Sequence, residues 1–182
     1  CKRAMQGITY EADKPLAVAV RHNMPPSPAD LPPSPNETIE LSYSGEPAAE
    51  SYCAAIFSAW PKITNIAYYN SPSVMSAMAE AGHAVPAVLD DYAQMIGVNA
   101  KIARSPKSAA GKLKGRNAVF IKGVGVLCCA GSESDCSAIM TLAEKNAMAY
   151  VLADRYGKVT PISYIDRRIM RHIYVTKYSK KK

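Results

Sequence analysis

The sequence predicts an α/β fold, in which helices pack in layers on a sheet. Short β-rich runs at 63–69, 98–103, 118–122 and 124–129 alternate with segments that carry helical signals. The clearest helix follows Ser132, where apolar residues recur at helical spacing. Strands that alternate with helices are typical of layered α/β architectures. The chain has 182 residues, enough for one domain with its own core, so we expect a single domain over 1–182.

Local signals place the remaining elements. The apolar stripe of the helix after Ser132 consists of Cys136, Ile139, Met140, Ala143, Ala147, Tyr150 and Val151. Further helices, bounded by proline or glycine, are expected at 47–60, 71–81, 88–96 and from Thr160-Pro161 onward, where Ile162, Ile165, Ile169 and Ile173 share one face. Outside the helices we expect strands at 15–20 and 37–43, a proline-rich surface loop between these two, and a turn at Val85-Pro86.

The composition argues against a secreted or membrane-spanning protein. The five cysteines form no Cys-x-x-Cys pair, and we expect free thiols in a reducing compartment, not a zinc cluster. No apolar run approaches the roughly 20 residues that cross a bilayer, so no membrane association is expected. Charged residues interrupt the first twenty positions, which argues against a signal peptide. We therefore expect a cytoplasmic protein.

The basic character of the chain does not predict nucleic-acid binding. The net charge is +7, but the excess is concentrated in 101–122 and in the lysines at the C-terminal end. A terminal lysine run is usually a solvated tail, and no RNA- or DNA-binding motif accompanies it. We expect no nucleic-acid partner.

Four sequence segments occur in a recognisable order. Glu46-Pro47-Ala48-Ala49-Glu50 opens a helix that ends near Trp60-Pro61, and a strand then leads to Tyr68-Tyr69-Asn70-Ser71-Pro72. Much later, Gly123-Val124-Gly125 precedes an apolar strand and a long helix. From about Gly45 to the end, this order resembles the class II aldolase/adducin family. That family includes fuculose- and rhamnulose-phosphate aldolases, ribulose-phosphate epimerases and the adducin head domain.

The resemblance implies an architecture and an assembly. It covers 45–182 most strongly, whereas the proline-rich segment 1–44 has no clear counterpart in the family. By resemblance, we expect a three-layer α/β/α domain around a mixed, mostly antiparallel sheet. Related enzymes are homotetramers with active sites at subunit junctions, so the resemblance also implies a homo-oligomer.

The resemblance also exposes a departure from the family at its metal site. The enzymes bind zinc through three histidines, and the residues at the matching positions here are Tyr68, Asn70 and Val124. Tyrosine is a rare zinc ligand, an amide oxygen is a weak one, and valine has no donor atom. We therefore expect no metal or other cofactor, and a non-catalytic or repurposed domain that assembles or binds. The alternative is a sugar-phosphate aldolase (an aldehyde-lyase) or epimerase with an atypical site.

Glu50 is the candidate catalytic residue. It takes the position of the family's catalytic Glu when Pro47 is aligned on the family's proline, whereas alignment on Pro61 places Ala49 there. A carboxylate in the first turn of a helix is also favoured by the helix dipole alone, and we prefer that explanation. Ala48 and Ala49 replace the paired serines that bind phosphate in the family.

The candidate substrate pocket is formed by residues around the altered metal positions. For a small sugar phosphate, the resemblance implies Tyr68, Tyr69, Asn70, Ser71, Gly123 and Gly125. The tyrosines are equally consistent with packing on a strand. The two glycines favour a tight turn between strands over a phosphate loop, because a third glycine and an adjoining helix are missing.

Overall fold

The computed structural model describes residues 17–21, 41–44 and 47–178 of the chain, and one sheet runs through its centre. The strands are β1 (Ala17–Arg21), β2 (Leu41–Ser44), β3 (Asn65–Tyr69), β4 (Ala84–Pro86), β5 (Asn99–Ala103), β6 (Ala118–Ile121) and β7 (Gly125–Ala130). The helices are α1 (Pro47–Ala59), α2 (Pro72–Ala81), α3 (Asp90–Met95), α4 (Pro106–Lys112), α5 (Glu133–Tyr156) and α6 (Tyr164–Ile173), and a π-helical turn, η1 (Tyr174–Tyr178), follows α6.

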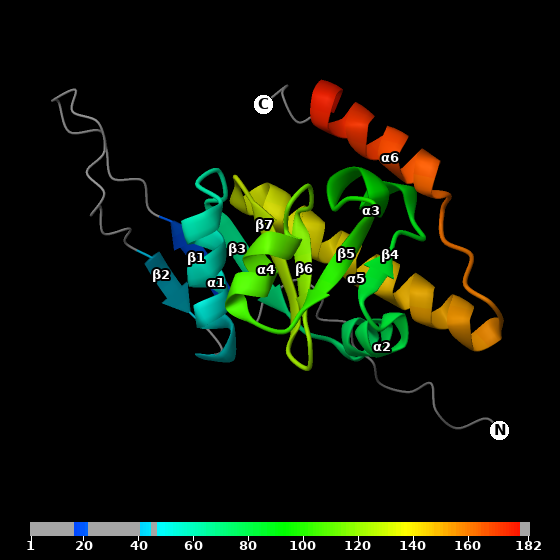
Figure 1. The fold of residues 1–182 in the computed structure, drawn as a ribbon, viewed down its shortest axis with the longest axis horizontal. Coiled ribbons are helices and arrows are strands. Elements are labelled where there is room, and N and C mark those ends of the chain that lie inside the picture. Colours follow the sequence, from blue (N-terminus) through cyan, green and yellow to red (C-terminus); the bar gives the residue numbers. More distant parts are fainter. Residues whose placement is uncertain (1–16, 22–40, 45–46, 179–182) are drawn as a thin grey trace, which may run out of the picture.

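The seven strands lie in the order β2-β1-β3-β7-β6-β5-β4. Every neighbouring pair is antiparallel except β5 and β6, which are parallel. One face of the sheet packs against α2, α3 and α5, and the other packs against α1 and α4. Figure 1 shows α1 and α4 in front of the strands and α5 behind them. The predicted three-layer α/β/α fold with a mixed, mostly antiparallel sheet is confirmed.

Strand β7 is apolar along its whole length because both of its faces are covered. Val126 and Cys128 contribute to the core under α2, α3 and α5. Leu127 and Cys129 contribute to the core under α1 and α4. Side chains alternate between the two faces of a strand, so a strand buried on both faces shows a continuous apolar run.

Helix α5 confirms the long helix predicted from the apolar stripe. Ile139 and Ala143 are buried, and Tyr150 packs against the same core. The Ser132 hydroxyl caps the helix by accepting from the Asp135 amide. The stripe therefore faces the sheet, as its period predicts.

Asn146 connects α5 to the segment that precedes α3. Its side chain is fully buried, and its Oδ1 accepts from the amides of Val88 and Leu89 at 2.9 and 3.3 Å. Its Nδ2 donates to the Pro86 carbonyl at 3.0 Å. A buried amide with these three bonds satisfies backbone groups that would otherwise lack partners.

Several sequence predictions need correction. Val85 and Pro86 belong to the short edge strand β4, where a proline is tolerated, and do not form a turn. The last helix begins at Tyr164, capped by Ser163, and not at Thr160. Helix α4 was not predicted, although Ser105-Pro106 opens it just as Ser71-Pro72 opens α2. The proline-rich loop, and residues 37–40 of the predicted second strand, lie outside the described residues.

The cysteines in the described part of the chain are buried thiols. Cys53, Cys128, Cys129 and Cys136 are free, as predicted, whereas Cys1 lies outside the described residues. Burial, with a smaller contribution from neighbouring thiols or carboxylates, raises the pKa of Cys53 and Cys136 to about 12. Burial also raises the pKa of Cys128 and Cys129 well above the ordinary value. These thiols are therefore protonated and poorly nucleophilic at neutral pH.

Helix α6 is attached to the domain through Arg167 and Arg171 and through Met170, which packs against the core under α2, α3 and α5. It lies outermost, over α3 (Figure 1). Arg167 donates to the Val98 carbonyl, and Arg171 donates to the carbonyls of Gln94 and Met95 at the end of α3. The isoleucine face points away from the domain: Ile165 is 69% exposed and Ile169 is 51% exposed. Within the described residues, no helix is long and apolar enough to span a bilayer.

The turn between β6 and β7 lies unusually close to the end of β3. Ile121 pairs with Gly125, and Gly123 takes the left-handed conformation (φ 74°) that a tight turn requires. A Cβ added at Gly125 would lie 2.5 Å from the Tyr69 carbonyl oxygen and 2.8 Å from the Tyr68 ring. Only glycine allows this approach without displacing the backbone. The predicted tight turn between strands is confirmed.

We predict that Gly125→Ala lowers the free energy of unfolding by about 3 kcal/mol, because the Tyr69 carbonyl oxygen and the buried Tyr68 ring block the new methyl group. The matched control is Gly123→Ala, where no atom lies within 4 Å and the cost is the left-handed φ alone, about 1 kcal/mol. Urea denaturation followed by circular dichroism measures both values. An equal decrease in the free energy of unfolding of the two variants would contradict the close approach at Gly125.

Candidate functional site

The three residues that the resemblance aligns with the family's zinc ligands meet at one point of the structure. The Tyr68 hydroxyl donates to the Val124 carbonyl at 2.9 Å. The Asn70 side-chain amide donates to the Tyr68 hydroxyl at 3.0 Å and to the same carbonyl at 3.3 Å. We call Tyr68, Asn70 and Val124 the Tyr68 cluster.

The end of β3 and the β6–β7 turn position the cluster. Tyr68 pairs with Leu127 on β7, and its ring is 1% exposed within the core under α1 and α4. Val124 packs against the same core from the turn. Asn70 lies just beyond the strand and is exposed. Tyr68 is therefore buried along its whole side chain, and its hydroxyl is hydrogen-bonded, as the hydroxyls of buried tyrosines commonly are.

A buried carboxylate lies beside the cluster. Glu144, on α5, is 4% exposed, and its Oε2 accepts from the Ser71 hydroxyl at 2.5 Å. Ser71 is also the N-cap of α2, since its hydroxyl accepts from the Val74 amide at 3.1 Å. The contact ties the residue after Asn70 to α5 and holds this segment in place.

Tyr69 points to the opposite side of the sheet from Tyr68. It is half-buried and packs against the core under α2, α3 and α5. Burial raises the pKa of its phenol, the nearby Glu144 carboxylate raises it further, and a hydrogen bond with Ser71 lowers it. Tyr69, Ser71 and Glu144 therefore form a polar group on the α5 side of β3.

The candidate catalytic residue Glu50 lies at the surface of the described structure. It is exposed in the first turn of α1. Among the described residues, no hydrogen bond or ion pair joins its carboxylate to the Tyr68 cluster. Its place in the first turn matches the helix-dipole explanation preferred from the sequence. Neighbouring Ala49 is buried in the core under α1 and α4, so its side chain does not face solvent as a phosphate ligand would.

The described side chains do not form a conventional metal site. No group of three or more His, Cys, Asp and Glu residues in the described ranges is arranged to hold an ion. His83 and His172 are exposed, and His22 lies outside the described residues. In the Tyr68 cluster the hydroxyl and the amide hydrogen-bond to a backbone carbonyl, and Val124 offers no side-chain donor atom. The chemistry of this set does not fit zinc.

The contact between Glu144 and Ser71 was not predicted from the sequence. A signal was present, because Glu144 lies beside Ala143 and one turn before Ala147 on the apolar stripe. A carboxylate at such a position is buried and needs a partner. The hydroxyl of Ser71 supplies one.

Comparison with known proteins gives a structural likeness without a sequence match. No family model matches the chain, and no curated protein sequence matches it. An L-fuculose 1-phosphate aldolase structure superposes with a TM-score of 0.67 at 15% identity, covering 87% of this chain and 85% of that chain. The L-fuculose 1-phosphate aldolase from Glaciozyma antarctica gives a TM-score of 0.61 at 15% identity, covering 88% of this chain and 74% of that one.

A third solved structure is similar over nearly the same length. YgbL from Escherichia coli, described as a putative aldolase/epimerase/decarboxylase, gives a TM-score of 0.59 at 15% identity, with coverage of 87% of this chain and 88% of that chain. The predicted class II aldolase-like architecture is therefore confirmed at the level of the fold. The chain has the fold of the L-fuculose 1-phosphate aldolases.

Proposed function

We propose that this chain is an aldolase-like domain without zinc chemistry that serves as a binding or assembly module. The Tyr68 cluster is the observation that carries the proposal. Three histidines that bind zinc must present neutral nitrogens to one ion and leave one position open. Here a phenol and an amide converge on a backbone carbonyl instead. The polar groups of the cluster satisfy one another, which suits a structural role.

The metal matters because aldol cleavage creates negative charge on the substrate. A bound metal ion polarises the substrate carbonyl and stabilises the enediolate that forms. The Tyr68 hydroxyl is a weak substitute, since it already donates to the Val124 carbonyl. The Val124 side chain is apolar and packs against the core, so it offers the substrate no polar group. The described residues therefore favour binding over carbon–carbon bond cleavage.

The second candidate function is a sugar-phosphate aldolase or epimerase with an atypical site. The buried Glu144 carboxylate and its short contact with Ser71 favour it, because buried carboxylates are common among groups that do acid–base work. The same contact also has a purely structural explanation, since it fixes the start of α2. We therefore rank this function second.

Restoring imidazoles at the cluster tests the placement of its three residues. We expect the triple variant Tyr68→His, Asn70→His and Val124→His to gain zinc affinity that the parent lacks. A ligand bound only by the folded state at about 100 times its Kd stabilises it by about 2.7 kcal/mol, which corresponds to a Tm increase of about 5–10 °C. Missing partners for the imidazole rings weaken such a site by about 10–100-fold, so the titration extends to high micromolar zinc.

The matched control for this test is the double variant that keeps Val124. Because Val124 is packed against the core, its replacement costs stability, and each variant is compared with itself with and without zinc. Differential scanning fluorimetry gives the shifts, and circular dichroism checks folding. A folded triple variant whose zinc-dependent shift does not exceed that of the double variant would show that the three residues do not share one site.

We further propose that the domain assembles into a homo-oligomer through the outer face of α6. Ile165, Ile169 and Ile173 form an exposed apolar row, with exposed Tyr164 at its start. Domains that function as monomers seldom expose a continuous apolar patch of this kind. The side of α6 that carries Arg167, Met170 and Arg171 already faces its own domain, so a second subunit is the simplest cover for the isoleucines.

Light scattering coupled to size exclusion tests this assembly. We expect an oligomer at tens of micromolar and its conversion to monomer in the double variant Ile165→Gln and Ile169→Gln. Leu152→Gln is the control, because Leu152 is exposed on α5 and lies outside the isoleucine row. A parent that is monomeric at this concentration, or an oligomer that survives the double variant, would refute the α6 interface.

A further inference from the structure

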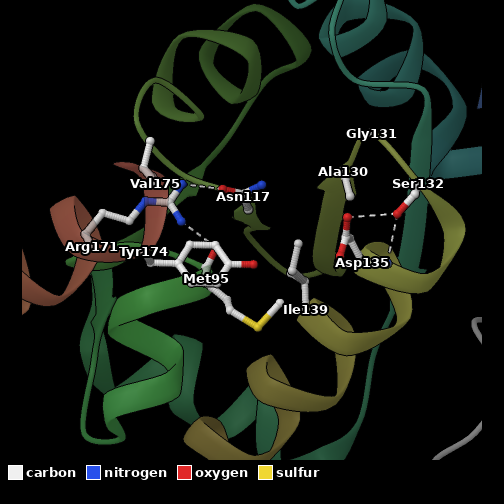
Figure 2. A pocket seen from close by; sticks show the side chains of 10 residues that line it. All are labelled: Met95, Asn117, Ala130, Gly131, Ser132, Asp135, Ile139, Arg171, Tyr174 and Val175. Carbon is white, nitrogen blue, oxygen red and sulfur yellow. Dashed lines mark hydrogen bonds between the residues drawn. The ribbon is translucent and has the colours of Figure 1, made fainter. Parts of the chain in front are cut away.

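A cavity lies at the other end of the sheet from the Tyr68 cluster. Its volume is about 470 Å³, within the range of small-molecule sites. Arg171, Tyr174 and Asn117 lie on one side of it, and Ser132, Asp135 and Ile139 lie on the other, as Figure 2 shows. Charged and polar side chains from α5, from the end of α6 and from the residue before β6 therefore line the same cavity.

The two sites are separated by the length of β7. Gly125, which contacts the Tyr68 cluster, begins the strand, and Ala130, which lines the cavity, ends it. Five residues of strand span about 16 Å. A ligand in the cavity would therefore be independent of the function proposed for the Tyr68 cluster.

Arg171 gives the cavity a positive charge that is not paired with an acid. Its Nη1 donates to the carbonyls of Gln94 and Met95, and its Nη2 donates to Asn117 Oδ1. These bonds use three of the five guanidinium N–H groups, so two donors remain. Among the described residues, no carboxylate lies within ion-pair distance of Arg171. Two donors suffice for the two oxygens of one carboxylate group.

A second arginine strengthens this positive charge. Burial lowers the pKa of Arg171, and the nearby Arg116 guanidinium lowers it further, while Tyr174 raises it. Arg116 bonds to Asn99 and to the Lys114 carbonyl, and no described carboxylate pairs with it. Arg171 lines the cavity and Arg116 does not, so Arg116 adds positive charge behind Arg171 and favours an anion at the Arg171 wall.

Asp135 restricts what kind of anion fits. It lines the opposite side, where its Oδ2 accepts from the Ser132 hydroxyl at 2.8 Å. A carboxylate has about four lone-pair positions, so Asp135 can accept a hydrogen bond from a ligand in addition to its bonds within the protein. It also repels a dianion such as phosphate. A ligand with a single negative charge can bind Arg171, and its hydroxyl groups can donate hydrogen bonds to Asp135.

We propose that this cavity binds a small polyhydroxylated carboxylate, with its carboxylate on Arg171 and its hydroxyl groups on Asp135. Tyr174, whose hydroxyl points toward α5 in Figure 2, offers a further polar contact in the middle of the cavity. Met95 and Ile139 line the cavity with apolar surface against which a carbon chain packs.

Three six-carbon probes separate the contribution of the carboxylate group to binding from the contribution of the hydroxyl groups. Gluconate carries a carboxylate and hydroxyl groups, hexanoate carries only the carboxylate, and sorbitol carries only hydroxyl groups. With the full chain, isothermal titration calorimetry should show gluconate binding about tenfold or more tighter than hexanoate or sorbitol. Equal affinity for all three probes, or no binding of gluconate at millimolar concentration, would overturn the proposal.

Variants locate the bound gluconate. Asp135→Asn and Arg171→Gln should each weaken gluconate binding about tenfold or more, and Arg171→Lys should retain more affinity than Arg171→Gln. Val175→Trp fills the cavity without changing its charge, and it tests the site if Arg171→Gln loosens α6. Lys114→Ala is the matched control, because it removes an exposed positive charge outside the cavity lining and should leave the affinity unchanged. Loss of binding in Tyr68→Phe, with Asp135→Asn and Val175→Trp unaffected, would place the ligand elsewhere and refute the proposal.

Discussion

The close approach of the β6–β7 turn to the end of β3 is the constraint on which the candidate site depends. Gly125 has no side chain, and this lets the backbone at Tyr69 and the ring of Tyr68 contact the turn directly. The Val124 carbonyl is thereby brought within hydrogen-bond distance of the Tyr68 hydroxyl and the Asn70 amide. Because Tyr68 and Val124 pack into one core, the cluster is part of the framework of the domain.

The Tyr68 cluster and the cavity lie at opposite ends of strand β7. The Tyr68 cluster lies where β3 ends and β7 begins, and the cavity lined by Arg171 lies where β7 ends. Since β7 is buried on both faces, it forms a rigid connection between these two ends. Helix α6 contributes Arg171 to the cavity with its inner side and exposes isoleucines with its outer side. Assembly and ligand binding would thus use opposite sides of one helix.

The sequence predicted the parts of the fold that follow from local periodicity. The stripe from Cys136 to Val151 required a buried face, and Ser71-Pro72 marked the start of α2. The orientation of α6 could not be predicted in the same way. A periodic row such as Ile165 and Ile169 indicates that one face is apolar, but not whether it points inward. The hydrogen bonds of Arg167 and Arg171 to backbone carbonyls turn the isoleucines outward, and periodicity does not encode such distant partners.

The candidate site was predicted less completely than the fold. Family resemblance brought Tyr68, Asn70 and Val124 into one group, and the structure places them together. The contact between Ser71 and Glu144 joins residues 73 positions apart, so it depended on how α5 packs on β3. The cavity at the other end was missed entirely, because Asn117, Ser132 and Arg171 come from three separate segments and form no sequence motif.

We propose that this chain, although it shares the aldolase fold, lacks the zinc chemistry of the class II aldolases. The most direct test of this proposal is the zinc content of the protein, purified without chelators and measured by mass spectrometry, alongside retro-aldol cleavage of a ketose 1-phosphate. We expect zinc far below one ion per chain and no cleavage above the uncatalysed rate. One tightly held zinc per chain, with cleavage that a chelator abolishes and added zinc restores, would contradict the account.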